Sequence, residues 1–362
     1  MDRERLGIVH LVFSPGSRPR RRPRTWPLAH GAIASIPLCH GHAENRALLL
    51  PRPPSANEAQ RLASRASAAI VRCYAAPTPG LIREPVFIVS APRAGSTLLF
   101  ELLARSPELW TVGGESHEIF ERRWQPPGLR GNALGAADAT AAAARIVHAG
   151  FASVLRDHCG RLLLAMSDGP RFPVRLLEKT PKNALRIPFL KAIFPGAKFV
   201  YLYREPRANI ASLIEGWRAL GRFVQYRPDG RPWCFLLPPN WPDLVGQSAH
   251  VVAGAQWRTA NEAIMGDLSA LDPSDSHCLD YEELVAHPGP ALAAIGRFAS
   301  VDLSGAIAAM TAAPPPLSSS VLAPPRPDKW TQHERSLDEI WPAVRGTIEQ
   351  YADYCAARRR RE

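Results

Sequence analysis

The chain has 362 residues, of which 46% are hydrophobic and 21% are charged, and its net charge is +11 at pH 7. This composition is typical of a globular protein and excludes a fibrous or wholly disordered chain. No apolar run reaches the ~20 residues of a membrane span. The six cysteines are scattered without a C-x-x-C pair, which argues against a zinc site or a disulfide framework. We therefore expect a reducing, cytoplasmic environment and no bound metal.

The positive charge is concentrated at the two ends of the chain. Residues 1–55 carry a net charge of +6 and eight prolines, and residues 358–362 carry +3, so the body between them is nearly neutral. We expect an Arg/Pro-rich tail without regular structure at 1–55, a single α/β domain at 56–357 and a basic C-terminal tail at 358–362. Because the body is nearly neutral, bulk charge gives no reason to expect a nucleic-acid partner.

Helical and strand patterns alternate along the body. After a helix at Asn57–Tyr74, short apolar runs rich in β-branched and aromatic residues predict strands at Val86–Ser90, Val174–Leu177, Lys198–Tyr203 and His277–Asp280. Helical spacing predicts helices at Leu98–Arg105, Asn183–Phe194, Arg207–Leu220, Ala249–Leu271, Pro290–Ala299 and Leu337–Cys355. Residues 221–246 and 314–327 are rich in proline and predict loops. This alternation predicts an α/β fold with a mostly parallel central sheet and helices on both faces.

A glycine-containing turn, Arg93-Ala94-Gly95-Ser96-Thr97, follows the first predicted strand and leads into the helix that begins near Leu98. Backbone N–H groups at such a turn point toward one place and bind an anion. Gly95 allows the backbone to approach a ligand closely, and the Arg93 guanidinium suits an oxyanion. Ser96 and Thr97 donate hydroxyls to the ligand or cap the helix. An ordinary strand–helix turn with a Ser/Thr cap is the alternative.

The turn lacks the residues of a nucleoside-triphosphate loop. Ser90 stands at the first glycine position, and no lysine separates Gly95 from Ser96. The strand Lys198–Tyr203 ends in Arg204 rather than in a metal-binding Asp. Two basic strand ends predict a ligand with two anionic groups and no Mg²⁺ requirement. A metal-dependent P-loop kinase or other nucleotide-binding protein, and a non-enzymatic nucleic-acid-binding protein that uses the basic tails, are the alternatives.

An ordered series of motifs between about residues 84 and 355 resembles the PAPS-dependent sulfotransferase superfamily, where PAPS is 3′-phosphoadenosine 5′-phosphosulfate. The closest likeness is to bacterial sulfotransferase-family proteins and protein-tyrosine sulfotransferases. The motifs are Ser90–Leu99, Gly113–His117, Glu178–Asn183, Tyr203–Ser212, Tyr281–Val285 and Lys329-Trp330. The resemblance implies a P-loop-NTPase-like fold and transfer of a sulfuryl group from PAPS to an acceptor hydroxyl or amine, with PAP as product.

The resemblance also implies roles for individual residues. Arg93 and the segment Ala94, Gly95, Ser96, Thr97 and Leu98 would hold the 5′-phosphosulfate, and Lys179 would reach its bridging oxygen or sulfuryl group. Arg204 and Ser212 would hold the 3′-phosphate, Tyr281 would line the adenosine pocket, and Lys329 would close over the phosphate. Two positions depart from the pattern: Ala208 stands where many relatives have an acid, and Gly216 where tyrosine sulfotransferases have a further basic residue.

The acceptor side is less defined. The resemblance places Glu115 at the position of the general base, with His117 as the reserve. Glu118, Phe120, Trp124 and the loop Phe223–Trp241 are expected to form the acceptor wall, although plain packing would explain the aromatic residues equally well. A small molecule, a carbohydrate, a lipid and a peptidyl tyrosine all remain open as acceptors.

Overall fold

The computed structural model describes residues 80–123, 131–165, 173–219, 223–312, 326 and 328–359. The expected N-terminal tail, the helix at Asn57–Tyr74, most of the crossing at 314–327 and Trp124 lie outside these residues. The expected domain boundaries therefore stay a prediction.

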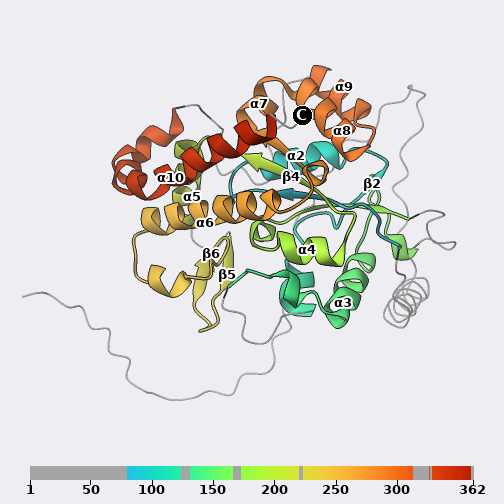
Figure 1. Ribbon diagram of the computed structural model, residues 1–362, viewed down its shortest axis with the longest axis horizontal. Helices are drawn as coiled ribbons and strands as arrows, with labels where there is room; N and C mark the ends of the chain where they lie inside the picture. The colour runs from blue at the N-terminus through green and yellow to red at the C-terminus, as the bar shows by residue number, and fades with distance from the viewer. Residues whose placement is uncertain are drawn as a thin grey trace, which may run out of the picture. The chain divides into compact units, whose positions relative to one another are not determined.

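A parallel sheet forms the centre of the described region (Figure 1). Its strands lie in the order β2-β3-β1-β4-β7, and every pairing between them is parallel. The strands are β1 (Val86–Val89), β2 (Leu109–Trp110), β3 (Arg175–Lys179), β4 (Lys198–Tyr203) and β7 (Ser276–Asp280). The glycine turn follows the central strand β1, so the fold is the predicted P-loop-NTPase-like arrangement with a mostly parallel sheet.

Helices cover both faces of the sheet because its strands are apolar on both sides. Phe87 and Val89 of β1 face a core shared with α3, α4, α5, α6 and α10, whereas Val86 and Ile88 face a core shared with α2, α8 and α9. The helices are α2 (Ser96–Leu103), α3 (Ala141–Ala152), α4 (Ile187–Ile193), α5 (Pro206–Arg218), α6 (Ala249–Ser269), α7 (Tyr281–Ala286), α8 (Pro288–Ala299), α9 (Ser304–Ala312) and α10 (Glu334–Arg359). The two-sided core confirms the predicted layers.

Short helical segments of other types connect these elements. A π-helix spans Ile119–Arg123, and 3₁₀ segments span Ala136–Asp138, Leu163–Ala165, Pro181–Leu185, Trp241–Leu244, Pro273–Asp275 and Lys329–His333. The single helix expected at Asn183–Phe194 is therefore a 3₁₀ segment followed by α4. The break falls at Arg186, just before Pro188, whose missing N–H cannot continue a helix.

The loop expected at 221–246 contains a hairpin. Strands β5 (Val224–Tyr226) and β6 (Pro232–Cys234) pair antiparallel around Arg227-Pro-Asp-Gly230. The Pro-Asp-Gly sequence is a turn signal that would have indicated the hairpin, but strands of three residues are too short to give a pattern of their own. At the C-terminus, α10 continues through Arg358, whose Nη1 donates to the Ser276 carbonyl at 2.6 Å. The first arginine of the expected basic tail is thus packed against β7.

Gly216 lies where α5 meets the hairpin. A Cβ atom at this position would lie 2.2 Å from Cζ of Phe235, so the ring occupies the space of any larger side chain. This contact gives a structural reason why a basic residue is absent from position 216.

We predict that Gly216→Ala lowers the free energy of unfolding by about 1–3 kcal/mol, the usual cost of overpacking. Denaturant titration measures it. Gly266→Ala is the control, because a Cβ atom there meets nothing within 4 Å, so this variant should be more stable by about 0.5–1 kcal/mol. Wild-type stability of Gly216→Ala would contradict the packing described.

Candidate active site

The loop between β1 and α2 has the backbone that close approach to a ligand requires. Arg93 and Gly95 are both left-handed, with φ of 68° and 101°. A Cβ atom on Gly95 would lie 2.4 Å from the Tyr281 ring, so only glycine fits there. Tyr281 begins α7 directly after β7 and packs on the loop, and its expected place in an adenosine pocket stays a prediction.

Two residues beyond β4 hold the same loop in place. Nη1 of Arg204 donates to the Arg93 carbonyl at 3.0 Å, and Nδ2 of the buried Asn209 donates to the Pro92 carbonyl at 2.8 Å. The Arg204 guanidinium also lies 4.9 Å from the centroid of the Tyr281 ring. Its Nε atom is buried without a hydrogen-bond partner among the described residues. The Nε–H group of Arg204 is therefore available as a hydrogen-bond donor beside the loop.

The Arg93 side chain turns toward α5 and the hairpin. Its Nε lies 3.4 Å from Oγ of Ser212, and its guanidinium lies 4.8 Å from the centroid of the Phe223 ring. Phe223 in turn stacks on Phe235 at 4.9 Å. The structure thus brings the residue expected to hold the phosphosulfate next to Ser212, expected to hold the 3′-phosphate.

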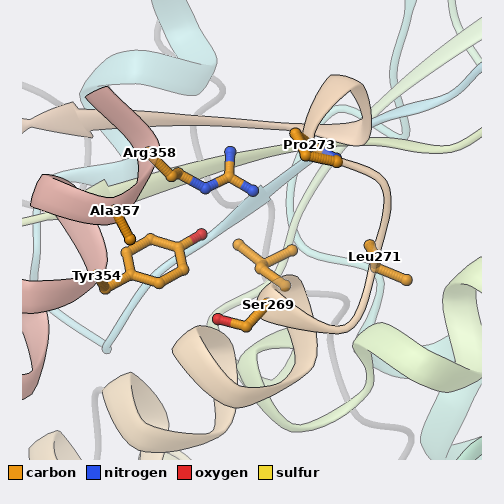
Figure 2. Close-up of a pocket in the computed structure, with 7 residues that line it drawn as sticks. Ser269, Leu271, Pro273, Tyr354, Ala357 and Arg358 are labelled. Atoms are coloured by element: carbon orange, nitrogen blue, oxygen red, sulfur yellow. The ribbon is translucent and has the colours of Figure 1, made fainter. Parts of the chain in front are cut away.

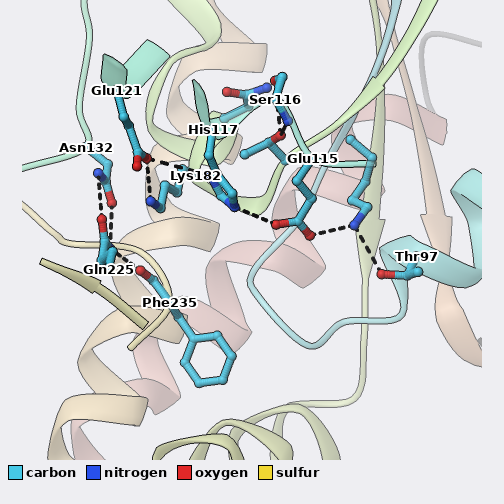
Figure 3. Close-up of polar contacts among 12 residues, drawn as sticks. Thr97, Glu115, Ser116, His117, Glu121, Asn132, Lys182, Gln225 and Phe235 are labelled. Carbon is cyan, nitrogen blue, oxygen red and sulfur yellow. Dashed lines mark hydrogen bonds and ion pairs between the residues drawn. The ribbon is translucent and has the colours of Figure 1, made fainter. Parts of the chain in front are cut away.

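Lys179 joins the loop to the turn that carries Glu115; Figure 3 labels its two partners, Thr97 and Glu115. It is the last residue of β3, and its side chain is only 5% exposed. Its Nζ donates to Oγ1 of Thr97 at 3.1 Å and to Oε1 of Glu115 at 2.6 Å. Three predicted site residues from distant parts of the chain therefore meet at one ammonium group.

A chain of charged groups continues from Glu115 (Figure 3). Oε2 of Glu115 lies 2.7 Å from Nε2 of His117, and Nδ1 of His117 lies 3.6 Å from Oε1 of Glu121 on the π-helix. Glu121 pairs with Lys182, and the buried Arg186 lies 3.9 Å from the same oxygen. His117 therefore sits between two carboxylates that are each also paired with a buried cation.

These contacts set the charges of the two candidate bases. Burial alone would raise the pKa of Glu115, but the hydrogen bond from His117 and the charge of Lys179 outweigh it and lower the pKa to about 2. Burial alone would lower the pKa of His117, but the hydrogen bond with Glu115 and the nearby carboxylate of Glu121 outweigh it and raise the pKa above 6.5. Both ring nitrogens of His117 therefore face carboxylate oxygens, and which of the two residues takes the acceptor proton stays a prediction.

Sequence reasoning assigned no role to Glu178, the buried carboxylate behind this turn. It accepts hydrogen bonds of 2.5 Å each from Oγ of Ser116, Oγ1 of Thr180 and Nδ2 of Asn183. The Ser116 N–H donates to Oγ1 of Thr180 at 2.8 Å. Ser116 lies between Glu115 and His117, so Glu178 fixes the direction of both. A glutamate directly after the apolar pair Leu176-Leu177, at the end of a predicted strand, is the signal that would have indicated this role.

Two further expected residues have other neighbours. Nζ of Lys329 pairs with Oε2 of Glu215, on α5, at 2.5 Å, and the role expected of this lysine stays a prediction. Phe120, expected either in the acceptor wall or in plain packing, is 2% exposed and packs edge-on against Phe151 and Phe189 in the core, which favours the packing alternative. Phe120 lies in the π-helix, a rare type of helix that residue types alone do not reveal. Glu118 is exposed.

Two cavities lie near the amino ends of the strands, away from the charged residues that follow the carboxyl ends. One, of about 120 Å³, is lined by Tyr354 and Arg358 of α10 and by residues 268–273, near the beginning of β7 (Figure 2). The other, of about 650 Å³, is lined by residues that precede β1 and β4. Ligands of open parallel sheets bind outside the carboxyl ends of the strands. The cluster of charged residues at those ends therefore identifies the site better than either cavity.

No group of three or more His, Cys, Asp or Glu side chains that could hold a metal ion occurs among the described residues. In the same residues, every helix is too short or too polar to cross a membrane.

Comparison with known proteins shows which family the chain belongs to. The model of the sulfotransferase family matches residues 85–305, and the chain belongs to this family. Protein-tyrosine sulfotransferase A of Caenorhabditis elegans is 27% identical over 135 residues, which cover 36% of this chain and 32% of that protein. The match therefore spans about a third of the relative's length.

Solved structures of sulfotransferases are also similar. One from Mycobacterium avium has 16% identity and a TM-score of 0.42, covering 81% of this chain and 86% of that chain. A mouse sulfotransferase crystallised with PAP has 13% identity and a TM-score of 0.34, covering 80% and 95%.

We predict that His117 titrates above pH 6.5 in an NMR experiment and that Glu115→Gln lowers its pKa, because one of its two carboxylate partners is lost. Its contribution to stability should be fully present below pH 6.5 and lost as the pH rises through the folded pKa. His148 is the internal control: burial lowers its pKa, and the substitution should not change it. A His117 pKa below 6.5 in the wild type would contradict the described contacts.

Proposed function

We propose that the protein transfers a sulfuryl group from PAPS to an acceptor hydroxyl or amine and releases PAP. The observation that carries the proposal is the position of Lys179, which connects Thr97 of the anion-binding loop with Glu115. The anionic donor would then lie on the Thr97 side of the ammonium group. The acceptor, with the proton that it must lose, would lie on the Glu115 side. The finding that the chain belongs to the sulfotransferase family supports the same reaction class.

The residues around the loop suit the two anionic groups of PAPS. Backbone N–H groups of Gly95–Thr97, the hydroxyls of Ser96 and Thr97, and Arg93 would hold the phosphosulfate. The N–H groups of Ala94 and Leu98 donate within the loop, to the carbonyls of Ala91 and Gly95, and would shape it. Arg204, with its unpartnered Nε, and Ser212 would hold the 3′-phosphate, while Tyr281 would line the adenosine pocket. Lys329 would have to exchange Glu215 for the phosphate to take part. When bound, PAPS supplies an activated sulfuryl group.

Transfer requires an acceptor in line with the bond that breaks. The acceptor oxygen or nitrogen bonds to sulfur as the bond from sulfur to the bridging oxygen breaks, and the electron pair stays on the phosphate of PAP. Lys179 and Arg93 stabilise the negative charge that develops there. Because these side chains provide the positive charge, we propose that the reaction requires no metal ion.

Glu115 takes the acceptor proton in this proposal. With a pKa of about 2 its carboxylate is a weak base as long as Lys179 stays paired with it. An anion on the loop would compete for the Lys179 ammonium and so raise the pKa of Glu115. The carboxylate would thus become a better base when the donor is present. The type of acceptor and the cytoplasmic location stay predictions.

We predict that Glu115→Gln lowers turnover of PAPS by about 10²–10⁴-fold, the usual contribution of a general base. PAP affinity should be unchanged or tighter, because Lys179 loses a competing partner. Calorimetry with PAP and a sulfate-transfer assay measure the two effects. Glu108→Gln, at an exposed glutamate before β2, is the control and should behave as wild type. Near-normal turnover of Glu115→Gln would refute the role of the base.

We further predict that Arg204→Ala weakens PAP binding by about 10–100-fold, as expected for lost charge-assisted hydrogen bonds. Arg297→Ala, at an exposed arginine on α8, is the matched control. The melting temperature of each variant shows whether the fold is retained. Unchanged PAP affinity in a folded Arg204→Ala protein would refute the 3′-phosphate site, and binding of Mg²⁺–ATP instead of PAP would favour a kinase.

A further inference from the structure

The ends of two neighbouring strands determine where the donor-site residues Arg204 and Tyr281 lie. Tyr203 is the last residue of β4 and Asp280 is the last residue of β7, and the two are paired in register. Arg204 and Tyr281 follow them directly in the chain. Any shift of these strand ends therefore moves the guanidinium that holds the loop and the ring that packs on Gly95.

One side chain from α10 contacts both strand ends. The Tyr351 ring stacks on the Tyr203 ring with centroids 3.5 Å apart and planes 8° apart. Its hydroxyl donates to Oδ1 of Asp280 at 2.6 Å. The helix α10, red in Figure 1, is held in turn by its packing along α6. Tyr351 thus connects the C-terminal helix to the last residue of each strand.

The hydroxyl of Tyr351 stays a donor over the whole pH range of enzyme work. Burial, followed by the hydrogen bond to Asp280, raises its pKa well above 10. The bond holds the Asp280 carboxylate against α10. A carboxylate released from α10 would be free to turn toward Arg204 or toward an incoming phosphate, and either change would weaken anion binding.

We propose that Tyr351 is a positioning residue of the donor site: it holds the ends of β4 and β7 so that Arg204 and Tyr281 face the loop at Gly95. The inference rests on the proposed function, because PAP is the ligand whose binding it explains. It gives α10, which lies beyond the region matched by the family model, a part in donor binding.

Calorimetry with PAP tests the proposal on the full-length chain. Tyr351→Phe keeps the stacked ring and removes the hydroxyl, so we expect the Kd for PAP to rise about three- to tenfold, the effect of one lost hydrogen bond. Tyr354→Phe is the matched control. Tyr354 lies one turn along the same helix, with its ring centroid 6.1 Å from that of Tyr201. The Kd of this variant for PAP should equal that of the wild type. The melting temperature without ligand is measured for each protein.

The outcomes separate the possible roles. A higher Kd in Tyr351→Phe but not in Tyr354→Phe supports positioning, whereas a lower melting temperature with unchanged Kd means that Tyr351 is merely structural and overturns the proposal. If Tyr351→Phe does not fold, Asp280→Asn weakens the same hydrogen bond from the side of its acceptor. A higher Kd for PAP in that variant then supports the proposal, and an unchanged Kd overturns it. Wild-type protein that binds no PAP would overturn the proposed function as well.

Discussion

The ion pair between Lys179 and Glu115 is the contact on which the site depends. A lysine at the end of a buried strand is costly to desolvate unless its charge is paired. Glu115 supplies the opposite charge and Thr97 a further acceptor, so the turn at 113–117 and the loop at 93–97 must both approach the end of β3. Glu178, behind the same turn, keeps it there through Ser116. Burial of one cation thus brings the two halves of the site together.

The parallel sheet explains why residues so far apart in sequence can share one site. Parallel strands place their carboxyl ends at the same edge. Here β1 leads to Arg93, β3 ends at Lys179, β4 leads to Arg204, and β7 leads to Tyr281. The charges at this edge suit two separate anionic groups. The positive charge of the site comes from a few individual cations at the strand ends. It does not depend on the net charge of the whole chain.

The sequence predicted the sheet and the loop well because both depend on local patterns. The strand at Lys198–Tyr203 was predicted to the residue, and Lys179 lies in contact with both Thr97 and Glu115. The roles expected of these residues stay predictions. What the sequence missed depends on partners distant in the chain. Phe120 is buried against Phe151 and Phe189, and Lys329 pairs with Glu215 across more than one hundred residues. Residue type alone cannot show either partner.

The most direct test of the account is transfer of labelled sulfate from PAPS, measured with chelator present over alcohol, carbohydrate, lipid and tyrosine-peptide acceptors, for wild type and Lys179→Met. We predict that the wild type forms a labelled product together with PAP and that Lys179→Met forms little, because it lacks the ammonium group between donor loop and base. If no acceptor is labelled and PAP does not bind, the protein is not a PAPS-dependent enzyme. If Lys179→Met transfers sulfate at the wild-type rate, the central role of the Lys179–Glu115 pair is contradicted.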